Sequence, residues 1–272
     1  MSLVGLVRGY WRRAAGVWLE RRLSRQPLKS PLGRSSWNQS LGNPTSFYLE
    51  CVRYFYQKLP GQLRQHRLYF HNVPCNRRGF GENAFHVMWY LLLEEFKPAN
   101  FLEIGVYRGQ VVSLIALWAR LNHISCSVYG VSPFSPAGDA VSKYRSDIDY
   151  YEDTLANFDH FNLPHPQLLR AYSTDPAAVE LIGTTDWEMV YIDGNHDYEV
   201  ARKDWEVCSR NVKPGGIIVL DDAALNTAYR PPACLASRGH PGPSRLTQEI
   251  DPSKFREILQ VGHNRTFQKI SS

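Results

Sequence analysis

Four carboxylates stand at the ends of short apolar runs, in positions where they could act together. Glu103 lies in the run 101–105, and Asp193, Asp221 and Asp222 come directly after two later runs. Polar residues just past the carboxyl ends of parallel strands gather at one edge of a sheet. Neighbouring strands lie about 4.8 Å apart, so two adjacent strands would bring Asp193 and the Asp221–Asp222 pair together.

Three converging carboxylates repel one another unless they are protonated or bridged by a cation. All-oxygen ligands of this kind suit Mg²⁺ or another hard divalent cation such as Mn²⁺ or Ca²⁺. The alternative is that Asp221 and Asp222 only cap a strand end and the turn after it. We favour a metal site with Asp193, Asp221 and Asp222 as ligands, because two adjacent aspartates face a third.

A histidine follows the first of these aspartates by three residues, in the same loop. The imidazole of His196 has an ordinary pKa near neutrality, which suits a general base beside a substrate hydroxyl. We therefore expect His196 and Asp193 to be catalytic, and a bound cation to keep the His196 ring neutral. The alternative is a histidine that only caps the following helix.

A glycine turn joins the first apolar run to an apolar helix. The stretch FLEIGVYRG, residues 101–109, predicts a buried strand and a turn through Gly105 and Gly109, followed by a helix over 110–120. Strand, glycine turn and helix form cofactor pockets at the carboxyl edge of α/β sheets. The pattern E-x-G-x-x-x-G differs from the G-x-G-x-x-G of dinucleotide sites, which disfavours a nicotinamide dehydrogenase.

Alternating strands and helices must position these residues. We expect apolar strands at 101–105, 127–131, 167–171, 187–192 and 216–220. Helices are expected at 47–59, 84–96, 110–120, 149–157, 198–211 and up to residue 181, with a loop over 69–81. A last helix is predicted at 252–259 and a last strand at 264–269. This alternation predicts an α/β fold with a doubly wound, mostly parallel sheet.

Charge separates a basic leader from the rest of the chain. The net charge of +5 combines +7 in residues 1–34, which hold eight Arg or Lys and one Glu, with −2 in the remainder. Residues 1–45 are predicted to form an amphipathic leader and a linker rich in Pro, Gly and Ser (26–44). Residues 46–272 are predicted to be one domain with a helical cap (46–97) and a substrate lid (223–246). A nucleic-acid partner is not expected, because the domain itself is mildly acidic.

The leader has apolar residues at helical spacing over 3–23, with arginines elsewhere on the helix. It could dock on a membrane surface, pack on its own domain or a dimer mate, or serve as an organelle transit peptide. No apolar run reaches ~18 residues, so no transmembrane helix is expected. Five scattered cysteines without a C-x-x-C pair favour a reducing compartment. We expect a cytoplasmic homo-oligomer with peripheral membrane contact through residues 3–23 if the leader docks.

Three stretches taken together resemble a known family. FLEIGVYRG, YIDGNHDYE and KPGGIIVLDD, in that order, are similar to the class I S-adenosylmethionine (SAM)-dependent methyltransferases. More narrowly, they resemble the metal-dependent sugar O-methyltransferases of macrolide biosynthesis (the macrocin and mycinamicin type) and their uncharacterised bacterial relatives. The resemblance covers roughly residues 75–270 and implies a Rossmann-like methyltransferase fold.

The resemblance also implies cofactor-binding residues. Glu103, Gly105 and Gly109 match the motif that holds the methionine end of SAM. Ser173 and Thr174 match the position that contacts adenine.

At the end of the second strand this sequence departs from the family. Ser132 stands where the family usually has an acid for the ribose hydroxyls. A serine can hydrogen-bond the ribose but carries no charge, and Asp139 in the following loop is expected to compensate.

For the reaction, the resemblance assigns the metal to Asp193, Asp221 and Asp222 and the base to His196. It implies metal-assisted O-methylation of a sugar or a similar polyol or glycoconjugate, in which a cation chelates neighbouring hydroxyls. The insert 230–244 would form a lid and substrate wall. The alternative is a catalytically lapsed methyltransferase fold that serves as a scaffold or partner of a glycan-modifying assembly.

Overall fold

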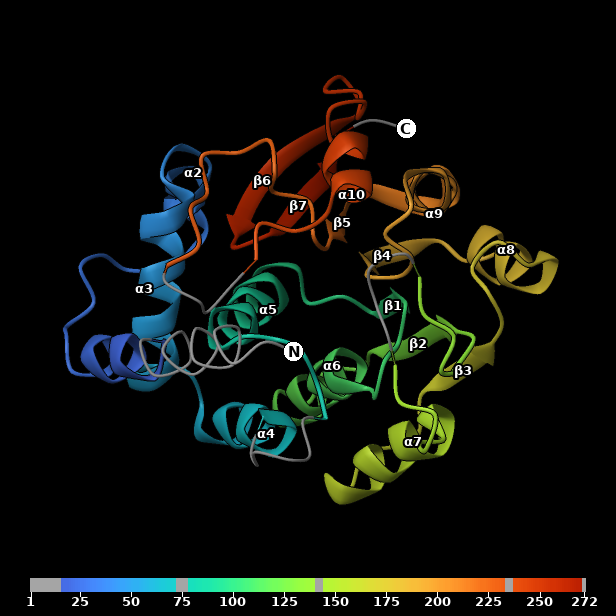
Figure 1. Cartoon of the computed structure of the whole chain (residues 1–272), viewed down its shortest axis with the longest axis horizontal. Coiled ribbons are helices and arrows are strands. Elements are labelled where there is room, and N and C mark those ends of the chain that lie inside the picture. Colours follow the sequence, from blue (N-terminus) through green and yellow to red (C-terminus); the bar gives the residue numbers. More distant parts are fainter. Residues whose placement is uncertain (1–15, 72–77, 140–143, 233–236, 271–272) are drawn as a thin grey trace, which may run out of the picture.

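A twisted sheet with helices on both faces forms the centre of the molecule (Figure 1). The computed structural model describes residues 16–71, 78–139, 144–232 and 237–270. Within these residues the seven-stranded sheet has the order β3-β2-β1-β4-β5-β7-β6. The strands are β1 (Asn100–Ile104), β2 (Ser127–Ser132), β3 (Gln167–Arg170), β4 (Trp187–Ile192), β5 (Val212–Leu220), β6 (Phe255–Val261) and β7 (Asn264–Lys269). The strands from β3 to β5 are parallel to one another and β7 is antiparallel to both its neighbours, which confirms the expected mostly parallel fold.

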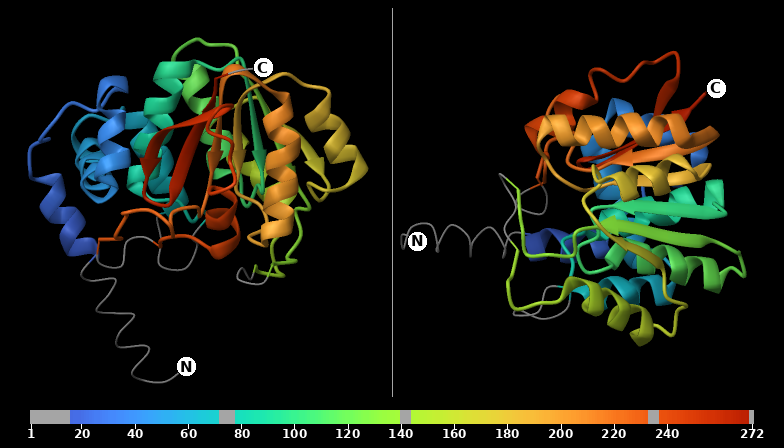
Figure 2. Two further views of the ribbon diagram at one scale, coloured as in Figure 1. Left: turned by 90° about the horizontal axis from the view of Figure 1, so that it is seen from above. Right: turned by 90° about the vertical axis from the view of Figure 1, so that its right-hand side faces the viewer.

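Helices cover the two faces in separate layers (Figure 2). The larger layer holds α3 (Pro44–Gln57), α4 (Gly61–His71), α5 (Asn83–Phe96), α6 (Gln110–Leu121) and α7 (Tyr150–His160). The other layer holds α8 (Pro176–Gly183), α9 (Tyr198–Asn211) and α10 (Pro241–Leu246). Strand residues alternate between the two cores: Met189 packs with the first layer and Val190 with the second. Burial on both faces explains why these strands are apolar almost throughout.

The carboxyl end of the chain differs from the sequence prediction. The segment 252–259 was expected as a helix, but its residues 255–259 belong to β6 (Phe255–Val261), which pairs with β7 along the edge of the sheet. An irregularity between Glu257 and Leu259 lets both Ile258 and Leu259 point inward. This bulge breaks the alternation expected of a strand, so the apolar positions imitate a helical spacing.

The segment 26–44, expected as a linker, is packed against the domain. It contains a 3₁₀ turn, η1 (Arg34–Ser36), and helix α2 (Trp37–Gly42). Trp37 is 1% exposed, and the backbone N–H of Gln260 in β6 donates to the Ser40 hydroxyl at 2.9 Å. Burial of the hydrophobic Trp37 side chain holds this segment against the domain, although its Pro and Gly content is typical of a linker.

Part of the basic leader belongs to the folded domain as well. Residues 16–23 are helical, Leu23 is buried, and Glu20 accepts hydrogen bonds from Tyr56 and Asn83. Trp18, in contrast, is 61% exposed. The rest of the predicted amphipathic helix falls on residues 1–15, which lie outside the described residues. Among the described helices none is both long enough and apolar enough to cross a bilayer.

Candidate functional site

The turn between β1 and α6, predicted from the glycine spacing, lies against the loop after β4. Gly105 and Gly109 both have positive φ, 95° and 77°, which side chains other than glycine rarely adopt. A Cβ on Gly105 would lie 2.0 Å from the backbone oxygen of Asp193, and one on Gly109 would lie 2.6 Å from Thr154. Only glycine therefore permits this close approach of two strand-end loops.

Glu103 is buried beneath this turn and supports it. Its Oε2 atom accepts a hydrogen bond from the backbone N–H of Val112 at 3.0 Å, in the first turn of α6. Burial raises the pKa of Glu103 to about 8, because the carboxylate form loses its hydration. The side chain thus fixes the start of the helix relative to the strand.

Two cavities meet at this turn. The small cavity, about 170 Å³, follows the ends of β1, β2 and β3, and the large cavity, about 470 Å³, lies between α5 and the ends of β4 and β5. Both are lined by Gly105, Tyr107, Tyr144 and Asp193. A ligand in the small cavity can therefore face a ligand in the large one across Gly105 and Asp193.

The small cavity collects the residues expected to bind the adenosine part of a cofactor. Ser132, Ser173 and Thr174 line it, together with the rings of Tyr150 and Tyr172. The Ser132 hydroxyl donates to the backbone oxygen of Val106 at 2.9 Å, so it ties β2 to the glycine turn. The structure thus brings these three polar residues together in one cavity, and their cofactor contacts stay a prediction.

Two of the three expected aspartates meet at the edge of the sheet. The carboxyl groups of Asp193 and Asp221 are hydrogen-bonded to each other. Burial and the neighbouring Asp221 charge raise the pKa of Asp193 well above its usual range. Burial opposes ionisation of Asp221 too, but His263, with its Nε2 atom 3.2 Å from Oδ1, holds the pKa of Asp221 below its usual range. The pair therefore holds one proton between two carboxylates.

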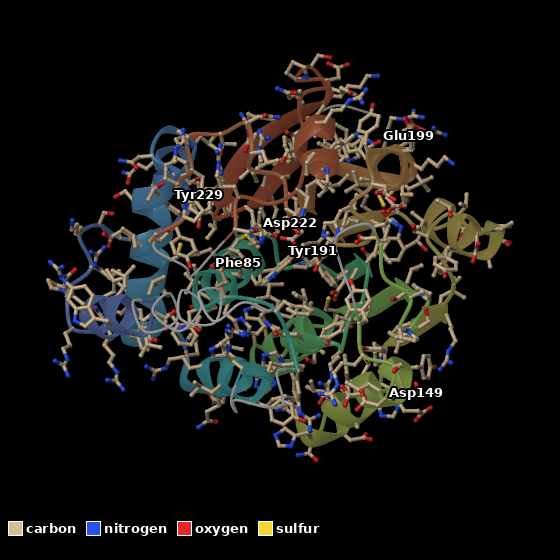
Figure 3. All side chains as sticks on the ribbon, viewed as in Figure 1. Phe85, Asp149, Tyr191, Glu199, Asp222 and Tyr229 are labelled. Carbon is tan, nitrogen blue, oxygen red and sulfur yellow. The ribbon has the colours of Figure 1, made fainter. Side chains whose placement is uncertain are left out.

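Asp222 points away from this pair and into a group of histidines. Its backbone has a positive φ of 51°. Its Oδ2 atom lies 2.9 Å from Nε2 of His196 and 3.4 Å from Nε2 of His240, and Oδ1 lies 3.6 Å from Nδ1 of His263. Figure 3 shows Asp222 near Tyr191 and Phe85, which also line the large cavity. The structure thus divides the predicted trio into a carboxylate pair and a carboxylate–histidine group.

His196 lies between two carboxylates, which the sequence did not predict. Its Nδ1 atom is 2.5 Å from Oδ2 of Asp139, and its backbone N–H donates to the same oxygen at 3.0 Å. Burial lowers the pKa of His196, but the hydrogen bonds and charges of Asp222 and Asp139 raise it to about 9. Without a cation these carboxylates favour the imidazolium form, and a neutral ring beside a bound cation stays a prediction. Asp139, expected near the ribose position, lines the small cavity with Ser132 and also contacts His196.

Two histidines of this site were not among the predicted catalytic, cofactor-binding or metal-binding residues. His240 comes from the insert 230–244, and together with Ser237 it makes the described part of that insert a wall of the large cavity. His263 comes from the turn between β6 and β7. The only sequence signal for His263 is its place after Gly262 between two apolar segments. The same pattern is typical of an ordinary hairpin turn.

The described residues hold two overlapping groups whose chemistry suits a divalent cation. One group is His196, Asp222 and His240, and the other is Asp221, Asp222 and His263; in each, the ligand atoms lie within 4.8 Å of one another. The Oδ1 atom of Asp221 is also buried and accepts no well-directed hydrogen bond. Carboxylates and imidazoles are usual protein ligands of such ions.

The comparisons with known proteins agree with this architecture. Residues 102–223, from β1 to just past β5, match the family model described as a methyltransferase domain. An uncharacterized protein of Acanthamoeba polyphaga mimivirus is 24% identical over 146 residues, which cover 51% of this chain and 60% of that protein. The chain thus spans less than two thirds of this relative.

Solved methyltransferases have a similar fold. TomG of Streptomyces achromogenes, an O-methyltransferase involved in tomaymycin synthesis and solved with SAM, is 13% identical, with a TM-score of 0.51 over 89% of this chain and 100% of that chain. A Podospora anserina methyltransferase bound to S-adenosylhomocysteine (SAH) is 14% identical, with a TM-score of 0.56 over 90% of this chain and 100% of that chain. The chain therefore has the Rossmann-like fold of these enzymes, and residues 102–223 resemble a methyltransferase domain.

Proposed function

We propose that this chain is a SAM-dependent O-methyltransferase that methylates a hydroxyl group of a sugar or a similar polyol, free or in a glycoconjugate. The observation that carries this proposal is the pair of cavities that meet at Gly105 and Asp193 on a methyltransferase domain. Methyl transfer requires the donor sulfur, the methyl carbon and the acceptor oxygen to lie in line. Two ligand spaces with one shared border provide this alignment.

The small cavity suits SAM. Ser132 can bind a ribose hydroxyl, Ser173 and Thr174 can bind adenine, and the Tyr150 and Tyr172 rings offer apolar surface for the base. The bare backbone at Gly105 allows the methionine part of the cofactor to approach the end of β1. Proteins of similar fold have been solved with SAM and with SAH, which supports the same ligand here.

The large cavity suits a polyol. Phe85, Trp89 and Tyr191 present aromatic surface to it, on which the apolar C–H faces of a sugar ring can pack. The carboxylates and histidines at the ends of β4 and β5 offer hydrogen-bond partners for hydroxyl groups. An acceptor placed between these two kinds of surface would point its hydroxyls toward Asp193.

A divalent cation fits the carboxylates and imidazoles at this edge, and Asp222, which belongs to both candidate groups, would help to hold it. When bound, it would supply positive charge that lowers the pKa of an acceptor hydroxyl. The base role expected of His196 needs a neutral ring, whereas its two carboxylate partners favour the imidazolium form. We therefore assign the acceptor proton to Asp221, the ionised member of the Asp193–Asp221 pair; Asp193 borders both cavities and Asp221 borders the large one.

Calorimetry with SAH tests the first part of this proposal. The full chain should bind SAH, should not bind NADH, and should release SAH from SAM when a suitable polyol is present. Mass spectrometry of the products from a panel of sugars would then identify an acceptor by a mass gain of one methylene. A folded protein that binds no SAH would instead support the scaffold interpretation.

A further inference from the structure

The group formed by His196, Asp222 and His240 is built like a ligand set. The Nε2 atom of His196 lies 2.9 Å from Oδ2 of Asp222, and the Nε2 atom of His240 lies 3.4 Å from the same oxygen. The centroids of the two imidazole rings are 4.4 Å apart. All three residues line the large cavity. They come from three separate segments: the loop after β4, the end of β5 and the N-terminal end of α10.

Close backbone contacts hold these three segments together. The N–H of His240 donates to the backbone oxygen of Asp222 at 2.8 Å, and a Cβ on Gly239 would lie 2.1 Å from that oxygen. A Cβ on Gly242 would lie 2.1 Å from the backbone oxygen of His196. The relative positions of the three side chains are therefore set by the backbone before any ligand binds, which is a requirement of a precise metal site.

An outer carboxylate orients one of the histidines. Asp139 lies 2.5 Å from Nδ1 of His196, so the proton on Nδ1 is donated to Asp139 and Nε2 faces Asp222. A carboxylate on the far nitrogen is the usual arrangement behind a metal-binding histidine, because it fixes the ring and makes the other nitrogen a better ligand.

From this geometry we propose that His196, Asp222 and His240 bind a first-row transition ion such as Fe²⁺, Co²⁺ or Zn²⁺. Two imidazoles and one carboxylate favour these ions over Mg²⁺, which prefers oxygen ligands. Three protein ligands on one side of the ion would leave other coordination positions open. The open positions face the large cavity. The inference rests on the proposed function, because the ion would lie beside the acceptor hydroxyls. This site would replace the all-oxygen site of Asp193, Asp221 and Asp222 that the sequence predicted.

The overlapping group that contains His263 fits less well. The Nδ1 atom of His263 is 3.6 Å from Asp222 and 3.1 Å from the Ser237 hydroxyl, while its Nε2 atom is directed to Asp221. This imidazole therefore divides its two nitrogens between different partners. His196 and His240 instead direct the same kind of nitrogen to the same oxygen, which is why we assign the ion to them.

Metal titration of the full chain, freed of metal with a chelator, tests the assignment. We expect one Co²⁺ or Zn²⁺ per chain, visible d–d absorption of the Co²⁺ form, and Mg²⁺ binding weaker by about 100-fold or more. His240→Ala removes a side chain that is 32% exposed and keeps the backbone contacts, so the variant should fold. It should weaken Co²⁺ binding by about 100-fold, and Asp139→Asn should weaken it by about 10- to 100-fold.

His165→Ala is the matched control, because this imidazole is 49% exposed and pairs with Asp159. It should leave Co²⁺ affinity and the visible spectrum unchanged. Equal affinity for Mg²⁺ and Co²⁺, no Co²⁺ binding by the wild type, or equal affinities of the His240→Ala and His165→Ala proteins would overturn the proposal. SAH calorimetry on the same samples reports the proposed function separately: a chain that binds Co²⁺ through His240 but not SAH keeps this metal site and loses the methyltransferase assignment.

Discussion

The two cavities of this molecule are built in different ways. The small cavity is lined by residues that follow the ends of three neighbouring strands, β1, β2 and β3, and its polar groups are mainly serines, threonine and tyrosines. The large cavity takes its lining from segments as far apart as Gly79 and His263, and it gathers the buried charges. One cavity is thus a consequence of sheet topology, and the other depends on how distant loops close over the sheet.

In the proposed function, the small cavity binds the cofactor and the large cavity holds the groups that act on the acceptor. Neutral polar groups near glycine backbone can bind a cofactor without a large desolvation cost. In the proposed reaction, the carboxylate pair and the carboxylate–histidine group would lie beside the acceptor oxygen, where their charges can change pKa values strongly. The variants below test whether the two cavities can be impaired independently, from the largest expected effect to the smallest.

Gly105→Ala should impair both cavities at once. The new Cβ would lie 2.0 Å from the Asp193 backbone oxygen at a residue with a φ of 95°. We expect loss of SAH binding and a decrease of about 3 kcal/mol or more in the free energy of unfolding, measured by calorimetry and urea titration.

Gly183→Ala is the control for this variant. Gly183 is the last residue of α8 and no other atom lies within 4 Å of its hypothetical Cβ, so stability and SAH binding should be retained. Similar behaviour of the two glycine variants would show that the turn is not the common border of the cavities.

Asp222→Asn should impair the large cavity alone. It removes the charge shared by two histidines, so metal binding should be lost and the rate of methyl transfer should fall by about 10²–10³-fold or more. SAH affinity should change by less than about twofold, because Asp222 does not line the small cavity. Asp197→Asn, at an exposed aspartate that makes no capping hydrogen bond, is the control. A parallel loss of SAH binding would mean that the cavities are coupled.

His196→Ala should change the pH dependence of stability in the metal-free protein. The pKa of His196 is raised from 6.5 to about 9, so its stabilising contribution is complete below about pH 6.5 and is lost as the pH rises through about 9. After allowance for screening by water, we expect the stability difference between wild type and variant to shrink by about 1–2 kcal/mol over this window. Urea titrations at pH 6 and pH 9.5 measure it. A difference that is constant with pH would show that the ring is not held by Asp139 and Asp222.

Ser132→Ala should have the smallest effect and impair the small cavity alone. It removes one hydrogen bond to Val106 and one candidate partner of the ribose. A hydrogen bond of this kind contributes about 0.5–1.5 kcal/mol, so SAH affinity should fall by about 2- to 10-fold. Co²⁺ affinity should stay the same. If SAH affinity is unchanged while the protein is less stable, the serine serves only the turn.

Much of the framework follows from local sequence. The parallel strands, the glycine turn after β1 and most helices were predicted within a few residues, because apolar periodicity and glycine placement act over short distances. The same signals failed at α4, at α10 and at β6, where a bulge imitates a helical spacing. Strand ends also placed Asp193, Asp221 and Asp222 at one edge, since topology alone brings the ends of β4 and β5 together.

Only the tertiary structure decided how those aspartates are used. Asp139, His240 and His263 reach the site through loops and a hairpin whose closure depends on packing across the whole domain. A short-range pattern carries no information on such contacts, because the segments meet only when the sheet is complete. The sequence by itself determined where charged groups would gather. The fold determined which of them became a proton-sharing pair and which joined histidines, because the pKa of a buried group depends on the neighbours within a few ångströms.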